Sequence, residues 1–268
     1  MDSSSHDNMS FLEHLEELRW HIIRSLIAIV SAGFICFLMK DFIFDTIIFG
    51  PKKMDFPTYK FLCQAATFIG VETTFCGDEF PFIVQNRTMA GQFSAHVMTS
   101  IISGFIISFP YILYEFWKFI SPGLLEKERA KSRGFIFISS LLFFIGVLFG
   151  YYIISPLSIN FLGTYQVSSQ VLNEIDLGSF IGLVRSSTLA SGIIFELPII
   201  IYFLTKAGVV TPESLVKYRK YALVLVLVLA AIITPPDVAS QIIVAIPIVV
   251  LYQVSIFISR IVVKNQAK

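Results

Sequence analysis

Apolar residues in this chain gather in long runs that are separated by short polar segments. Several runs hold about 20 apolar residues, roughly what a helix needs to cross the ~30 Å hydrocarbon core of a bilayer. A membrane-spanning barrel would instead show alternating segments of about 10 residues. The pattern therefore predicts six membrane-spanning helices, at residues 20–39, 93–117, 134–156, 180–204, 222–233 and 238–258.

The last two predicted spans are weaker than the others. The run at 222–233 holds only 12 residues, or roughly 18 Å at ~1.5 Å per residue. Pro247 lies inside the run at 238–258, where it removes one helical hydrogen bond. We expect two short helices that either thin the bilayer around them or form a hairpin packed against the rest of the protein.

Composition places the chain among integral membrane proteins. Of its 268 residues, 55% are hydrophobic and 15% are charged, and the mean hydropathy is +0.76. No water-soluble core could hide so much apolar surface. Because neither an internal repeat nor a soluble segment beyond loops is evident, we expect an all-α fold with a single membrane domain over residues 1–268.

The distribution of lysine and arginine predicts the orientation. Fourteen lie on one side: two in the N-terminal segment, five between the second and third spans, four between the fourth and fifth, and three after the sixth. The opposite side has five, all in one long loop at 40–92. Both termini are therefore expected in the cytoplasm, with 40–92 as a periplasmic loop. The first 18 residues are acidic, so we expect the first run to remain as a span and not to be cleaved as a signal.

The three cysteines divide between the membrane and the external loop. Cys36 lies inside the first predicted span and is expected to be a small packing residue. Cys63 and Cys76 both lie in the external loop, where an oxidising compartment would let them pair. The alternative is two free thiols.

Two acidic segments lie on the predicted cytoplasmic side. The stretch SFLEHLEELRWHIIR at 10–24 predicts an amphipathic helix, which we assign as cytoplasmic over residues 1–19. Four of its polar residues recur at three- and four-residue steps and share one face: Glu13, Glu17, His21 and Arg24. Glu126 and Glu128 form the second cluster, among five cations. Paired carboxylates suit planar guanidinium groups, but a solvated interfacial helix and a charge cluster that only sets orientation would give the same pattern.

Glu196 is the strongest single signal, because it lies in the apolar run SGIIFELPIIIYFL at 191–204. An ionisable group inside a span is a functional candidate by default. Arg185 lies eleven residues earlier, about 16 Å along the axis and too far for direct contact. Glu196 could relay protons, or hydrogen-bond a polar side chain of another membrane helix. A structural bond within this chain is the plain alternative.

The sequence contains no pattern typical of enzyme or cofactor chemistry. None of the four histidines joins a cysteine or carboxylate cluster with metal-ligand spacing, and neither common glycine-rich nucleotide loop is present. We therefore expect no enzyme activity, no cofactor, no metal site and no nucleic-acid partner. Energy for any transport must come from elsewhere.

Five motifs in order resemble the TatC family, the multi-spanning receptor subunit of the twin-arginine protein translocase. They are HLEELR at 14–19, YEFWKFISPGLLEKER at 114–129, LLFFIGVLFGYYIISPL at 141–157, FELP at 195–198 and TPPDVASQ at 234–241. The resemblance implies a receptor that binds the paired-arginine signal peptide of an already folded protein. It also implies that TatA/TatB-type single-span membrane subunits are organised around it for export driven by the proton-motive force. Six helices in a concave, glove-like arrangement, a multimeric complex and the bacterial cytoplasmic (inner) membrane are further implications.

The resemblance also assigns roles to residues of the receptor site. Carried over by motif, Glu17 and Glu128 would meet the two arginines of the signal peptide, with Arg19 and Phe119 nearby. Where many family members have a second basic residue two positions after the motif arginine, this chain has His21. Local charge at the site could therefore depend on pH.

A second set of positions lies within or beyond the membrane. By motif, Glu196 would face a partner helix, with Gln241 in the same intramembrane partner site. Asp237 and Pro51 match further family positions. The runner-up interpretation is a proton-coupled small-solute transporter with Glu196 as the relay and Arg185 as an anion site, although no inverted repeat supports it. A purely structural scaffold is a third possibility.

Overall fold

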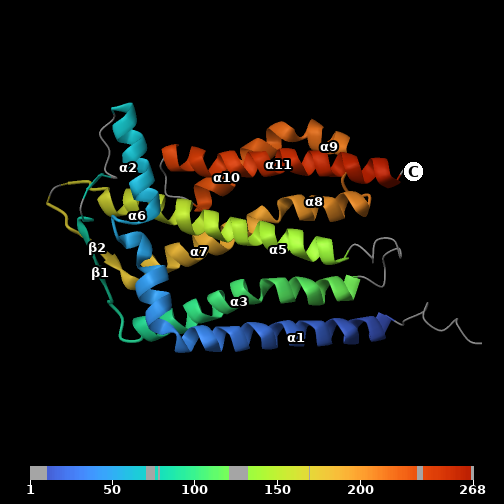
Figure 1. Ribbon diagram of the computed structural model, residues 1–268, viewed down its shortest axis with the longest axis horizontal. Coiled ribbons are helices and arrows are strands. Elements are labelled where there is room, and N and C mark those ends of the chain that lie inside the picture. The colour runs from blue at the N-terminus through green and yellow to red at the C-terminus, as the bar shows by residue number, and fades with distance from the viewer. Residues whose placement is uncertain are drawn as a thin grey trace, which may run out of the picture. The chain divides into compact units, whose positions relative to one another are not determined.

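The computed structural model is built mainly of helices (Figure 1). It describes residues 11–70, 76–77, 79–120, 132–168, 170–233 and 238–266. These residues form two compact units, the first from Met1–Met39 and Val97–Leu141 and the second from Lys40–His96 and Leu142–Lys268. Two compact units can share one bilayer, so the single membrane domain stays a prediction.

Five segments are long and apolar enough to cross a membrane among the described residues: His14–Leu38, Gly91–Ile120, Gly134–Thr164, Leu177–Lys206 and Ser240–Gln266. They correspond to α1 (Phe11–Leu38), α3 (Gly91–Ile120), the run α5 (Ser132–Phe149), η5 (Gly150–Ile154) and α6 (Ser155–Thr164), the pair α7 (Leu177–Phe195) and α8 (Leu197–Lys206), and α11 (Val238–Gln266). The chain is thus a multi-pass membrane protein. The predicted fifth span is α10 (Arg219–Ile233), whose 15 residues reach only about 22 Å. The count of six spans therefore stays a prediction.

In the first unit, α1 and α3 lie side by side and run antiparallel (Figure 1). The hydroxyl of Ser108 on α3 donates to the carbonyl of Ala28 on α1 at 3.0 Å. Gly104 permits the close approach, because a Cβ there would lie 2.5 Å from the backbone nitrogen of Gly33 and 2.6 Å from the carbonyl oxygen of Ile29. Small residues at such crossings let two membrane helices pack backbone to backbone.

The second unit is held together around η5, α10 and α11. Its buried apolar cluster comprises Ile154, Val226, Ala230, Val244, Ala245 and Ile248. The hydroxyl of Thr205 on α8 donates to that of Ser259 on α11 at 2.9 Å. The short helix α9 (Pro212–Lys217) begins with a capping box in which Thr211 and Ser214 exchange hydrogen bonds.

The segment predicted as a long loop at 40–92 contains regular structure. It includes a π-helical segment η1 (Phe42–Ile48), a 3-10 turn η2 (Gly50–Lys52), helix α2 (Pro57–Ile69) and strand β1 (Phe82–Gln85). Strand β1 pairs in parallel with β2 (Asn173–Asp176), so that Phe82 lies opposite Asn173. The expectation of an all-α fold misses this small sheet, because the two strands are far apart in sequence and too short to show an alternating pattern.

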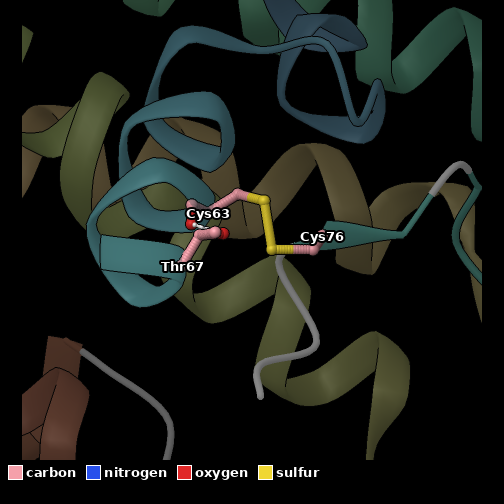
Figure 2. Close-up of a disulfide and its surroundings, with 3 residues drawn as sticks. All are labelled: Cys63, Thr67 and Cys76. Carbon is pink, nitrogen blue, oxygen red and sulfur yellow. Dashed lines mark hydrogen bonds between the residues drawn. A yellow bond between two sulfur atoms is a disulfide. The ribbon is translucent and has the colours of Figure 1, made fainter. Parts of the chain in front are cut away.

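A disulfide joins Cys63 on α2 to Cys76, with the Cα atoms 5.1 Å apart (Figure 2). Helix α2 ends at Ile69 and is capped by Gly70, whose φ of 76° is left-handed and suits glycine. The hydroxyl of Thr67 also donates to the carbonyl of Cys63 at 2.8 Å. The bond thus ties Cys76 to α2.

Tyr59 anchors α2 to the rest of the second unit. Its side chain is fully buried, and its hydroxyl lies 2.9 Å from the carbonyl oxygen of Pro51 and 3.0 Å from that of Pro156. Burial raises the pKa of the Tyr59 phenol, so the hydroxyl keeps the proton that it shares between the two carbonyls. The adjacent hydroxyl of Thr58 donates to the carbonyl of Tyr152.

Replacing Tyr59 by phenylalanine is expected to lower the free energy of unfolding by about 1 to 3 kcal/mol, because two buried carbonyl groups lose their donor. Thermal unfolding of the detergent-solubilised protein measures the loss. The matched control is Tyr221→Phe, since Tyr221 is 73% exposed on α10. Equal melting temperatures for both variants would contradict the assigned role of Tyr59.

Candidate functional site

One face of α1 lies against the C-terminal end of α3 in the first unit. The imidazole of His14 stacks on the ring of Phe119, with centroids 4.5 Å apart and an interplanar angle of 21°. One helical heptad later, His21 meets the same ring edge-on at 6.2 Å. Two histidines of α1 therefore flank Phe119, which is the aromatic residue that the motif assigns to the receptor site.

Glu17 lies between these two histidines on α1 and is half-buried. Its Oε2 atom is buried and has no hydrogen-bond partner among the residues that the structure describes. A buried acceptor without a donor costs about 1 to 3 kcal/mol, and more when it is charged. Glu17 is therefore ready to accept a hydrogen-bond donor from a bound molecule.

Arg19 occupies a different side of α1 from Glu17, since residues two apart on a helix do not face each other. Its side chain is exposed, and its guanidinium lies 5.8 Å from the ring centroid of Trp20. The structure thus brings Glu17 and Phe119 to one helix face but leaves Arg19 outside that group.

Glu115 is a site residue that the sequence reasoning missed. This carboxylate on α3 is 3% exposed, and its Oε2 atom lies 2.6 Å from Nδ1 of His21 and 3.8 Å from Nη1 of Arg24. The contact fixes α1 against α3 one turn from Glu17, and so it positions the helix face that carries Glu17. His21, which the sequence analysis placed on the polar face of the N-terminal helix and treated as a change in local charge, is buried in this pair. An acid within the predicted span 93–117 was the signal that could have singled out Glu115.

Two of the assigned residues, Glu128 and Asp237, lie outside the described residues. No group of three or more His, Cys, Asp or Glu side chains in the described part of the chain could hold a metal ion.

Glu196 lies in the second unit at the break between α7 and α8. Pro198 follows two residues later and has no N–H to continue the helix. The carbonyl of Glu196 instead accepts from the N–H groups of Ile199 and Ile200 at 2.9 and 3.0 Å. The residue is 8% exposed within the apolar segment Leu177–Lys206, so its carboxyl group lies at an interrupted helix inside a segment that is long and apolar enough to span a membrane.

Gln241 and Pro51 make contacts within the chain. The amide of Gln241 on α11 donates from Nε2 to the carbonyl of Leu227 on α10 at 3.0 Å. Pro51 is buried, and its carbonyl accepts from Tyr59. Gln241 therefore links the short α10 to α11, and Pro51 accepts the hydrogen bond that holds Tyr59 of α2 in place.

Comparison with known proteins decides the family. A family model described as Sec-independent protein translocase protein (TatC) matches residues 13–247. The chain belongs to the TatC family. This match contains every site residue that the sequence analysis named, including Glu17, Phe119 and Glu196.

Relatives within the TatC family cover nearly the whole chain. A Sec-independent protein translocase protein TatC of Blattabacterium sp. subsp. Periplaneta americana is 46% identical over 261 residues, covering 97% of this chain and 98% of the relative. The protein of the same name from Aquifex aeolicus is 35% identical, covering 96% and 98%. A crystal structure titled Twin Arginine Translocase Receptor TatC aligns with a TM-score of 0.66 at 33% identity, covering 94% of this chain and 100% of that one. A second, in the detergent DDM, aligns with a TM-score of 0.70 at 35% identity, covering 92% and 99%.

TatC membership fixes the general role of the chain. It is a membrane component of the Sec-independent protein translocase, which is a transport system and not a family of catalytic enzymes. The five long apolar segments found among the described residues agree with that role.

Proposed function

We propose that this chain is the receptor and core subunit of the translocase, and that it binds paired-arginine signal peptides of folded proteins on the face formed by Glu17 and Phe119. The observation that carries the proposal is the buried Oε2 atom of Glu17, which has no hydrogen-bond partner within the described part of the chain, beside the histidine-flanked ring of Phe119. Arg19 and Glu128, which match the same family motifs, belong to the proposed site. Arg19 would act from a neighbouring side of α1.

Arginine chemistry fits these groups better than lysine chemistry. A guanidinium is a planar fork that hydrogen-bonds a carboxylate through two N–H groups and also stacks on aromatic rings, whereas an ammonium is a compact point charge. Each charged hydrogen bond adds about 1.5 to 3 kcal/mol. Two arginine contacts, one to Glu17 and one to Glu128, would therefore discriminate a paired-arginine peptide from a paired-lysine peptide.

Partner subunits are proposed to dock in the second unit at Glu196. They are TatA/TatB-type single-span subunits of a multimeric complex, and the proton-motive force drives export. The support is an acid buried at an interrupted helix within an apolar segment. Gln241 is proposed to serve the same site, as it holds α10 against α11.

The short α10 is proposed as the fifth of six spans in the concave arrangement of the family. Its 15 residues are too few to cross ~30 Å of hydrocarbon, so the bilayer beside it would be thinner. Lipid density in a cryo-EM map tests this idea directly. A bilayer of ordinary thickness around α10 would contradict it.

Export of a folded reporter tests the whole proposal. Cells that lack their own version of this subunit would receive this chain with its single-span partners, and the reporter would carry either a paired-arginine or a paired-lysine signal peptide. We expect export to the periplasm, which also tests the proposed inner-membrane location, only with paired arginines. Absent export, together with solute transport by the purified chain alone, would favour the proton-coupled transporter instead.

A further inference from the structure

Arg185 is a half-buried cation that the proposed function does not use. It lies on α7, eight residues after Leu177, or about 12 Å along the helix axis, within the apolar segment Leu177–Lys206. Its Nε and Nη1 atoms are buried and have no hydrogen-bond partner among the described residues. A guanidinium inside a span is costly unless an acceptor compensates it. The side chain is half-buried, so an acceptor from another molecule can reach it.

Arg185 and Glu196 lie along the same face of α7. Their separation of eleven residues is about three helical turns, which leaves the two positions only about 20° apart around the axis and about 16 Å apart along it. A second helix that packs along α7 and meets Glu196 would therefore also pass Arg185, three turns nearer the predicted external side.

Small residues beside Arg185 make this face suitable for a helix. Gly178 and Gly182 lie seven and three residues before Arg185 on α7, about 20° and 60° from it around the helix axis, and they are exposed and half-exposed. A Cβ added at Gly182 would have no atom within 4 Å. Such small-xxx-small steps let a second helix backbone approach closely. Flexible lipid chains have no need of this spacing, so a protein helix is the occupant that fits.

We propose that Arg185 is a docking site for a carboxylate carried by a partner's single transmembrane helix, which lies along the small-residue face of α7. The acid lies in the external half of the partner's span, three turns from the residue that meets Glu196. This inference rests on the proposed docking of single-span subunits at Glu196. It adds a second contact, at Arg185, and it states that the partner's group at that contact is negatively charged.

Cysteine crosslinking in membranes that contain the complete translocase tests the site. Gly182→Cys places a thiol on the proposed face without a clash. Ile246→Cys, at a position 58% exposed on α11, is the matched control away from that face. We expect Gly182→Cys to crosslink single cysteines scanned along one face of the single-span subunit, and Ile246→Cys to give at least fivefold less product.

Charge variants decide whether Arg185 is the contact. In the Gly182→Cys background, Arg185→Gln is expected to lower the crosslinked product at least fivefold, and Arg185→Lys to lower it less. Arg185→Glu is expected to lose the product and to regain it when the partner's acid is replaced by arginine. This charge swap keeps the test decisive if Arg185→Gln accumulates poorly.

Three results would overturn the inference. The first is an unchanged amount of crosslinked product with Arg185→Gln. The second is a partner that has no aspartate or glutamate in the external half of its span. The third is an anionic phospholipid that native mass spectrometry finds bound to the protein and that Arg185→Gln alone removes. The partner docking at Glu196 is tested separately with Glu196→Ala. If Glu196→Ala weakens the association and Arg185→Gln does not, only the inference about Arg185 fails.

Discussion

Replacing Gly104 by valine is expected to separate α1 from α3 and to lower the free energy of unfolding by about 3 kcal/mol, the upper range for an overpacked core. A Cβ at this position would lie 2.5 to 2.7 Å from backbone atoms of Gly33 and Ile29. Because these are backbone atoms, no side-chain rotation relieves the clash. The helices must move apart, and the contact of His21 with Glu115 that positions Glu17 should be lost with them.

Thermal unfolding and signal-peptide crosslinking of Gly104→Val measure the two consequences. The matched control is Gly134→Ala on α5, where a Cβ meets no atom within 4 Å. That variant should unfold like the parent protein or slightly later, since alanine favours a helix over glycine. A Gly104→Val protein with parental stability and crosslinking would contradict the close helix approach.

Glu196→Ala is expected to weaken the association with single-span subunits by about 5- to 30-fold. This range corresponds to the roughly 1 to 2 kcal/mol of a hydrogen bond between membrane helices. Co-purification from detergent at several subunit concentrations measures the change. Signal-peptide crosslinking in the same membranes should stay at the parental level, because Glu17 lies in the other unit.

Glu196→Gln separates docking from proton transfer. Glutamine keeps the size and hydrogen-bonding capacity of the side chain but cannot ionise. We therefore expect Glu196→Gln to retain most of the association that Glu196→Ala loses. Normal association in both variants with a changed proton flux would replace the docking role by a proton relay.

The long helices follow from the apolar runs, since a run of that length has few other structures available in lipid. The run predicted at 93–117 is the helix Gly91–Ile120. The third predicted span ends at Pro156. The helix instead continues to Thr164, because Pro156 lies in the first turn of α6, where no intrahelical N–H is needed, and the π-helical η5 precedes it.

Pairings between distant residues were not accessible from the sequence. Glu196 could be singled out because it interrupts an apolar run, and Glu17 because its motif resembles that of the TatC family. Glu115 instead contacts His21, which is 94 residues away in the sequence. Gln241 contacts Leu227, which is 14 residues away. Such contacts exist only after the helices have packed.

The most direct measurement is crosslinking of paired-arginine and paired-lysine signal peptides to the complete translocase with Glu17→Gln or Glu128→Gln. Glu16→Gln is the control, since Glu16 is an exposed neighbour on α1. We expect the parent and Glu16→Gln to prefer paired arginines, and each of the other variants to lose roughly 10- to 100-fold of the product, the equivalent of one charged hydrogen bond. Unchanged crosslinking and an unchanged preference in both variants would contradict the receptor site.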